Sequence, residues 1–392
     1  MAKYKGDSTR SIHQGERRIK PCDSITTPVV QSSTFPFENT QAICDFFDGK
    51  VQRVEEYGRY GNFTQHVAEE KLKELDRGEA ALLFSSGMSA VTTTLLALLN
   101  IRSHIIFTSD CYKKTRQFAT EVLEKYQVDT SIVEPDVEKI EAAIKDNTRI
   151  IFSESPTNPY LNVLDLKALV QLAHRKKIMT IIDSTFASPY NQRPIEFGID
   201  LVIHSCTKYL GGHNDLIAGV AIGPAQQIEK IKQYQGILGP IPSPWTCYLL
   251  IRGLKTFALR MARHNHNGIE VARFLEGQKK AERVHYPGLE SHPHHHIARK
   301  QMNGYGGVVS FELKGDREAA SRFVDNLNLF YITPSFGGPE SLVSQPAVMT
   351  YYELDEQQRK KKGIKDNLVR LSVGLEDAED LIDDLRQAFD RL

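Results

Sequence analysis

The chain has 392 residues with an ordinary hydrophobic content of 41%, and its 49 lysines and arginines balance 49 aspartates and glutamates. Such a length suits two or three domains or one large α/β unit, and the neutral balance gives no support for a nucleic-acid or membrane-surface partner. The longest apolar stretch, Leu95 to Ile101, is far shorter than the ~20 residues that a membrane-spanning helix requires.

The first 50 residues alternate polar clusters with short apolar pieces. The piece from Pro28 to Pro36 favours an extended chain, because proline and the residue before it resist helical geometry. We therefore expect residues 1–50 to form an N-terminal extended arm.

A different rhythm begins at about Thr64, where helical patterns alternate with short apolar runs. This alternation predicts βαβ units and a mostly parallel central sheet that is buried on both faces. The predicted strands are Ala80–Phe84, His104–Thr108, Arg149–Ser153, Met179–Ile182 and Leu201–His204. The predicted helices between them are Val91–Leu99, Lys114–Tyr126, Val137–Ile144 and Leu164–Lys177. We assign residues 51–245 to this α/β domain.

The pattern changes after about Trp245, where long helical stretches surround fewer strands. The predicted elements here are a helical stretch at Tyr248–Phe274, a strand at Gly307–Glu312, and helices at Arg317–Leu327 and Ala378–Leu392. We expect residues 246–392 to form a smaller C-terminal α+β domain.

Ligands of parallel α/β sheets bind beyond the carboxyl ends of the strands, so the residues that follow each predicted strand matter most. The first predicted strand is followed by Ser85-Ser86-Gly87-Met88 at the start of a helix. Glycine allows close backbone approach, and the free N–H groups of a helix start attract an anion. Taken alone, this segment is better explained as an ordinary capped strand-to-helix turn.

Two further strand ends carry an acid and an amine. Asp183 follows the fourth predicted strand, and Lys208 follows the fifth, with Ser205 and Thr207 just before it. Pyridoxal 5′-phosphate requires three such groups. An anion-binding helix start holds its phosphate, a carboxylate pairs with its ring nitrogen, and a lysine amine condenses with its aldehyde. Tyr112, beyond the second predicted strand, offers either a face for ring stacking or a core contact.

These residues fall in a pattern that resembles the Cys/Met metabolism pyridoxal-phosphate enzymes over nearly the whole chain. That family contains cystathionine γ-synthases, cystathionine lyases and methionine γ-lyases. The matching segments are Tyr57–Asn62, Ser86–Met88, Glu154–Pro159, Ser205–Asn214, Arg252–Thr256 and Ser335–Ser341. Within the family, plant-type cystathionine γ-synthases are most similar in Asp110–Arg116, Ser335–Gly338, Gln345–Ala347 and Gly363–Arg370.

The resemblance implies fold type I (aspartate aminotransferase-like), with residues 51–245 as the pyridoxal-phosphate-binding domain. It implies a catalytic role for Lys208, Tyr112 and Tyr57, with Lys208 joined to the cofactor as a Schiff base. The implied cofactor-binding residues are Lys208, Asp183, Gly87, Met88, Ser205, Thr207, Tyr112, Tyr57 and Arg59. The implied substrate-binding residues are Arg370, Ser335, Asn158, Glu340 and Lys114.

The resemblance also implies a shared active site. Tyr57 and Arg59 would reach the cofactor phosphate of the neighbouring subunit, so the expected assembly is a homo-oligomer, a dimer of dimers. The implied reaction is γ-replacement on an O-activated homoserine with cysteine, giving cystathionine. Lys113, Lys114 and Arg116 indicate either an anionic leaving group, phosphate or succinate, or a solvated helix face.

Three alternatives stay open at this point. A γ-lyase of the cystathionine or methionine type would release α-ketobutyrate and ammonia from the same starting chemistry. A related enzyme would use another nucleophile for γ-replacement. A non-catalytic pyridoxal-phosphate or dinucleotide-binding regulator lacks support, because no Gly-x-Gly-x-x-Gly fingerprint follows a first strand.

No metal site is predicted. The dense histidines His292 and His294 to His296 lack a carboxylate or cysteine framework, and a polar loop explains them. The five cysteines are odd in number, widely spaced and without a Cys-x-x-Cys pair. This favours reduced thiols and a cytoplasmic location.

Overall fold

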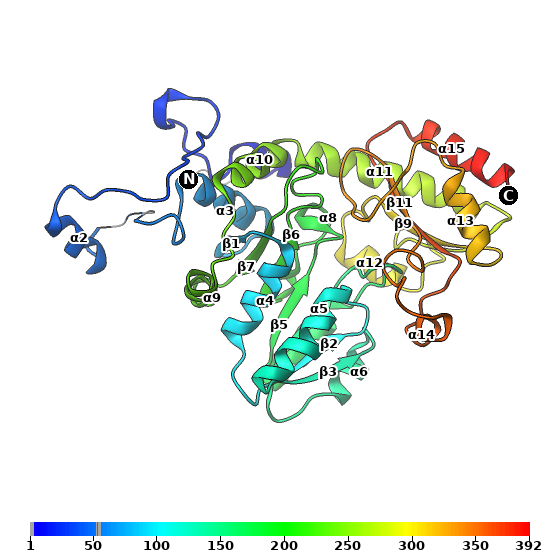
Figure 1. Ribbon diagram of the computed structural model, residues 1–392, viewed down its shortest axis with the longest axis horizontal. Helices are drawn as coiled ribbons and strands as arrows, with labels where there is room; N and C mark the ends of the chain where they lie inside the picture. The colour runs from blue at the N-terminus through cyan, green and yellow to red at the C-terminus, as the bar shows by residue number, and fades with distance from the viewer. Residues whose placement is uncertain (1–3, 52, 54–55) are drawn as a thin grey trace.

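A computed structural model describes residues 4–51, 53 and 56–392. Figure 1 shows a body with two sheets and an N-terminal segment, containing α2 (Thr40–Phe47), that projects away from that body. None of the helices in these ranges combines the length and apolar composition needed to cross a membrane.

The larger sheet has seven strands in the order β1-β7-β6-β5-β4-β2-β3. Strand β7 runs antiparallel to β1 and β6, and the other neighbouring pairs are parallel, which confirms a mostly parallel sheet. The strands are β1 (Ala80–Phe84), β2 (His104–Thr108), β3 (Asp129–Val133), β4 (Thr148–Glu154), β5 (Met179–Asp183), β6 (Leu201–Ser205) and β7 (Gly219–Gly223). All five predicted strands are present, whereas β3 and β7 were not predicted.

Both faces of this sheet are covered, because neighbouring residues of each strand point to opposite sides. Ile181 packs into one apolar cluster, and Ile182 packs into another. Helices α3 (Phe63–Asp76) and α7 (Leu166–Lys176) lie on one face, and α4 (Gly87–Leu98) and α9 (Ala225–Leu238) lie on the other. Helix α6 (Val137–Ala142) packs beside α7.

The prediction of one continuous helix at Lys114–Tyr126 is wrong. Only α5 (Lys113–Gln117) is α-helical, and residues 118–122 form a π turn before a 3₁₀ turn at Leu123–Tyr126. Such turns are tolerated in short pieces and are frequent near functional sites. The same apolar spacing therefore fits three helix types, and the sequence pattern did not distinguish them.

The smaller sheet has five strands in the order β10-β11-β12-β9-β8. Its strands are β8 (Ala281–His285), β9 (Val308–Leu313), β10 (Tyr331–Ile332), β11 (Leu342–Ser344) and β12 (Leu368–Ser372). Helices α11 (Phe257–Glu276), α13 (Arg317–Asp325) and α15 (Ala378–Asp390) share one apolar cluster with it. Short helices α12 (His295–Gln301) and α14 (Glu356–Lys361) lie in the connections.

The helical stretch predicted at Tyr248–Phe274 is two helices. Helix α10 (Pro244–Lys255) is separated from α11 by the single residue Thr256. It packs on α3, which covers the larger sheet. The residue pair 245/246, taken as a domain boundary, thus lies in the first turn of α10. The division into residues 1–50, 51–245 and 246–392 stays a prediction.

The N-terminal residues are more structured than an extended arm. Helix α1 (Asp7–His13) packs on α3, and Lys71 of α3 donates to the carbonyl of Ile12 at 2.8 Å and pairs with Glu16 at 2.9 Å. Beyond a 3₁₀ turn (Pro21–Asp23), the chain has no helix before α2, and Thr34 forms an isolated antiparallel bridge with Tyr57. The arm is thus held to the body through α1 and, further along, through hydrogen bonds of Val30 with Asn62 and Thr64 at the start of α3.

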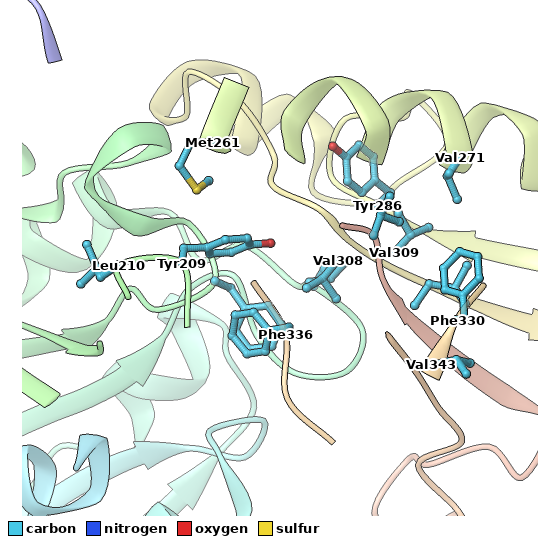
Figure 2. Close-up of a cluster of buried hydrophobic side chains, with 14 of the residues drawn as sticks. Tyr209, Leu210, Met261, Val271, Tyr286, Val308, Val309, Phe330, Phe336 and Val343 are labelled. Atoms are coloured by element: carbon cyan, nitrogen blue, oxygen red, sulfur yellow. The ribbon is translucent and has the colours of Figure 1, made fainter. Parts of the chain in front are cut away.

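The two sheets meet in a shared core, part of which Figure 2 shows. Tyr209 is buried there, its ring 5.5 Å from that of Phe336, and its hydroxyl accepts a hydrogen bond from Gly307 N–H at 2.9 Å. Tyr209 directly follows Lys208, and Phe336 directly follows Ser335. This packing therefore fixes two loops, one from each sheet, side by side.

Candidate active site

Lys208 lies in the loop beyond β6, and its amine points to the smaller sheet's loop. Lys208 Nζ donates a hydrogen bond to Ser335 Oγ at 2.6 Å and lies 5.2 Å from the ring centroid of Phe336. Burial, and then the positive charge of Arg370, lower the pKa of Lys208 to about 8. An appreciable fraction of the amine is therefore uncharged near neutral pH, as a nucleophile requires.

Asp183 ends β5, the strand beside β6. Its Oδ1 accepts hydrogen bonds from Thr185 N–H at 3.0 Å and from Thr185 Oγ1 at 2.5 Å. Burial raises the pKa of Asp183, and the two bonds from Thr185 oppose that rise. Both bonds reach the same oxygen, and among the described residues none donates to Oδ2, which leaves that oxygen for a ligand N–H.

The start of α4 forms a close-fitting cradle. Ser86 caps the helix by accepting a hydrogen bond from Ser89 N–H at 3.0 Å. A Cβ at Gly87 would lie only 2.9 Å from Ser205 Cβ, so glycine is required there. The N–H groups of Gly87 and Met88 fall in the first turn, where an α-helix has no internal acceptors. Such amides, with the hydroxyl of Ser205, suit a phosphate.

Thr207 stands beside the cradle in the loop that carries Lys208. Its hydroxyl accepts a hydrogen bond from Ala218 N–H at 3.2 Å. The same hydroxyl donates to the carbonyl of Ala218 at 3.4 Å, a long bond that it would exchange for one to a phosphate oxygen.

Tyr112 lies at the start of α5, with 44% of the residue exposed. Its backbone N–H donates to Oε2 of Glu154, the last residue of β4, at 2.8 Å. Its aromatic face is thus open to a planar ligand at the edge of the site, which a core contact would not allow.

Arg370, from β12, brings a guanidinium group to the site. Nη1 donates to Asn158 Oδ1 at 3.0 Å, and Nη2 donates to the carbonyl of Ser335 at 3.1 Å. Burial lowers the pKa of Arg370 to about 10, so the group stays charged at neutral pH. Its Nε has no hydrogen-bond partner among the described residues although it is buried. Ser335 itself has a backbone φ of +100°, a strained value that functional sites often contain.

Glu340 and Lys114 lie further out. Glu340 accepts a hydrogen bond from Asn214 Nδ2 at 2.8 Å and lines a cavity of about 890 Å³ together with Ser335 and Thr207. Lys114 is exposed on α5, where its amine donates to Gln117 at 2.7 Å. It does not line the cavity.

Tyr57 and Arg59 are, like Lys114, predicted site residues for which no contact with Lys208 or with the cavity is found among the described residues. Arg59 donates to the carbonyl of Gly236, in α9, at 2.7 Å, and its guanidinium lies 5.5 Å from the ring centroid of Tyr57. Tyr57 is 41% exposed, and both residues lie between the projecting arm and α3.

The residues present fit pyridoxal phosphate. A glycine-containing helix start, a carboxylate with one open oxygen and a partly uncharged amine occupy the ends of β1, β5 and β6. Sequence reasoning missed Glu154 and Phe336. Glu154 follows the predicted strand Arg149–Ser153 and could have been found by the rule that found Asp183, whereas Phe336 lay in the matching segment Ser335–Ser341 without a role assigned to it. Among the described residues, no group of three or more His, Cys, Asp or Glu could hold a metal ion.

Comparison with known proteins identifies the class. A sequence profile described as "Cys/Met metabolism PLP-dependent enzyme" matches residues 8–390. The fold is the α/β fold type I of pyridoxal-phosphate enzymes, as predicted. The chain belongs to the Cys/Met metabolism family, so it is an enzyme that uses pyridoxal phosphate on small amino-acid substrates.

The relatives differ from one another in the activity that their names give. The chain is 47% identical over 390 residues to cystathionine gamma-synthase 1, chloroplastic, of Nicotiana tabacum, covering 98% of this chain and 72% of that protein. It is 39% identical over 395 residues to an L-methionine gamma-lyase of Fusobacterium nucleatum, covering 99% and 98%. The crystal structure of metB from Corynebacterium glutamicum superposes with a TM-score of 0.92 at 38% identity, covering 98% of each chain.

Proposed function

We propose that this enzyme catalyses γ-replacement on an O-activated homoserine with cysteine, giving cystathionine. The observation that carries the proposal is that one residue, Ser335, contacts both the amine of Lys208 and the guanidinium of Arg370. An amino acid has its α-carbon and its carboxylate one bond apart. An amine base and a carboxylate-binding arginine that meet at one serine suit such a substrate.

Bound pyridoxal phosphate supplies an aldehyde that condenses with amines and a protonated ring that accepts the electron pair released at the substrate's α-carbon. Lys208 would carry the group. Asp183 would hold the proton on the ring nitrogen, and Gly87, Met88, Ser205 and Thr207 would bind the phosphate. Tyr112 would stack on the ring, and Phe336 would exclude water beside the amine.

The substrate carboxylate would bind Arg370. The guanidinium offers a planar pair of donors that matches a carboxylate, and the bonds to Asn158 and Ser335 hold its plane fixed. Lys208 Nζ, released when the substrate amine takes its place, would remove the α-proton. In the net reaction the C–O bond at Cγ breaks, the C–S bond forms, and the cysteine thiol loses its proton.

Lys114 supports an anionic leaving group. Its two basic neighbours are occupied, because Lys113 pairs with Glu353 and Arg116 donates to the carbonyl of Ser109 at 2.6 Å. Among the residues that the structure describes, Lys114 has only the neutral Gln117 as a hydrogen-bond partner, at 2.7 Å. A charged amine beside Tyr112 would attract a phosphate or succinate ester more than an acetate ester.

The test is an assay of O-phospho-, O-succinyl- and O-acetylhomoserine, each with and without cysteine. We expect cystathionine, together with the phosphate or carboxylate released from the ester, only when a homoserine ester and cysteine are both present. Borohydride reduction followed by peptide mapping should locate the cofactor on Lys208, and Lys208→Ala should abolish the reaction. Dominant release of a keto acid from cystathionine would overturn the synthase assignment.

A γ-lyase is the second candidate, because the chain is 39% identical to an L-methionine gamma-lyase. The two reactions share every proposed cofactor residue. In γ-replacement the cysteine thiol completes the reaction. In the lyase reaction, water and proton transfer complete it instead. Release of α-ketobutyrate and ammonia without cysteine, faster than cystathionine formation with it, would favour the lyase.

We also propose a homo-oligomer, a dimer of dimers, in which Tyr57 and Arg59 complete the site of the neighbouring subunit. The projecting arm and the 41% exposure of Tyr57 support this arrangement. Lys208→Ala and Arg59→Ala subunits, each inactive alone, should regain about a quarter of wild-type activity after co-expression, because half of the dimers are mixed with one intact site. Absence of recovery would indicate sites within single subunits. The cytoplasmic location stays a prediction.

A further inference from the structure

Glu154 has a buried carboxyl group in the active-site region that the proposed reaction does not use. It is the last residue of β4 and is 3% exposed. In the parallel pairing of β4 with β5, Glu154 lies opposite Asp183. Residues opposite each other in register project from the same face of a sheet, so the two carboxyl groups lie on one side.

A second contact joins Glu154 to the ring proposed to stack on the cofactor. Glu154 Oε2 accepts the hydrogen bond from Tyr112 N–H at 2.8 Å. Tyr112 is the N-cap residue of α5, and its side chain makes no capping bond. The carboxyl oxygen therefore fixes the backbone from which the aromatic ring projects.

The surroundings of Glu154 decide its charge. Burial, and then the carboxylates of Asp183 and Asp110, raise the pKa of Glu154 well above its ordinary value, and the hydrogen bond from Tyr112 N–H and the charge of Arg116 oppose this rise. Arg370 is the other charged group that interacts with it. Burial beside two further carboxyl groups thus favours the protonated form of Glu154.

Hydrogen bonds indicate where that proton stays. Asp183 accepts two bonds, both from Thr185, and these favour its charged form. Glu154 accepts one, from Tyr112. Asp183 is therefore the better anion, and Glu154 is the better place for the proton.

We propose that Glu154 is a positioning residue whose uncharged carboxyl group fixes Tyr112 and leaves Asp183 as the anion that faces the cofactor ring. This inference rests on the proposed function, because it requires pyridoxal phosphate on Lys208. A charged Glu154 would compete with Asp183 for the positive ring.

Glu154→Gln and Glu154→Ala separate the two parts of the proposal. The amide of Gln is neutral at every pH, and its oxygen can accept from Tyr112 N–H, so E154Q should keep kcat and the Kd for pyridoxal phosphate within about threefold. E154A loses the acceptor for a buried N–H, so its Kd should rise and its kcat should fall about tenfold or more. The circular dichroism of the bound cofactor should change in E154A and be restored in E154Q.

Glu312→Ala is the matched control. Glu312 is a buried glutamate that is 2% exposed and pairs with His285 and Lys365, away from Lys208. E312A should lower the thermal midpoint of the apoprotein without changing the cofactor's circular dichroism. Were E154A not to fold, Glu154→Asp, shorter by one methylene, would take its place with the same readouts.

Two results would overturn the proposal. If E154Q lost as much kcat and cofactor affinity as E154A, a charged carboxylate would be needed at this position. An E154A protein whose cofactor dichroism and Kd match those of E312A would mean that Glu154 does not position Tyr112. Failure of the wild-type protein to bind pyridoxal phosphate would instead reject the proposed function, so the two failures are distinguishable.

Discussion

Reconstitution of the apoprotein with pyridoxal phosphate should follow the ionisation of Lys208. Its pKa is lowered to about 8 by burial and by Arg370, whereas an ordinary lysine has a pKa of 10.5. Only the uncharged amine attacks an aldehyde. At pH 7 the uncharged fraction is about 9% for a pKa of 8 and about 0.03% for 10.5, a gain of about 300-fold.

The assay is the initial rate at which the visible absorbance of the bound cofactor grows when apoprotein and pyridoxal phosphate are mixed between pH 6 and 9.5. The rate should rise about tenfold per pH unit below pH 8 and level off above it. Arg370→Gln removes the positive charge, so the midpoint should move to higher pH.

Arg263→Gln is the control for that shift. Arg263 is a cation on α11 that pairs with Asp377 and is not among the groups that lower the pKa of Lys208. R263Q should leave the midpoint unchanged. A wild-type rate that keeps rising through pH 9.5, or a midpoint that R370Q does not move, would refute the electrostatic reasoning.

Three further outcomes are expected. Asp183→Ala removes the buried anion proposed for the ring nitrogen, so the Kd for pyridoxal phosphate should rise about 100-fold or more, measured by fluorescence titration. Arg370→Lys keeps the charge but loses the paired donors, so kcat/KM should fall about 10- to 100-fold while the cofactor spectrum stays unchanged. Lys114→Ala removes an exposed charge, so KM for O-phosphohomoserine should rise about two- to fivefold, with no change for the acetyl ester.

The larger sheet was predictable because its apolar runs are continuous. Ile181 and Ile182 serve opposite faces, so a strand buried on both sides has no polar interruption. Strand β7 was missed because it begins and ends with glycines, Gly219 and Gly223, which read as turn residues. Strand β3 was missed because it is an edge strand with exposed positions.

Residue patterns alone indicated candidate site residues only where a chemically distinctive residue follows a strand along the chain, and the family resemblance implied the others. Asp183 and Lys208 satisfy that rule, and the strands they follow are neighbours. The contact of Lys208 with Ser335 was not derivable from spacing, because 127 residues separate them. Likewise, the contact between Glu154 and Tyr112 depends on strand order, which local patterns do not specify.

Ser335 explains how two sheets act as one site. Its loop is held against the loop of Lys208 by the packing of Phe336 on Tyr209. Gly337 is part of the same fit, because a Cβ there would lie 2.7 Å from Tyr209 N. A loop so confined tolerates the strained φ of +100° at Ser335, which aims its hydroxyl at the amine and its carbonyl at Arg370. The carboxylate binding proposed for Arg370 and the amine chemistry proposed for Lys208 would thereby be linked, since both groups bond the same residue, Ser335.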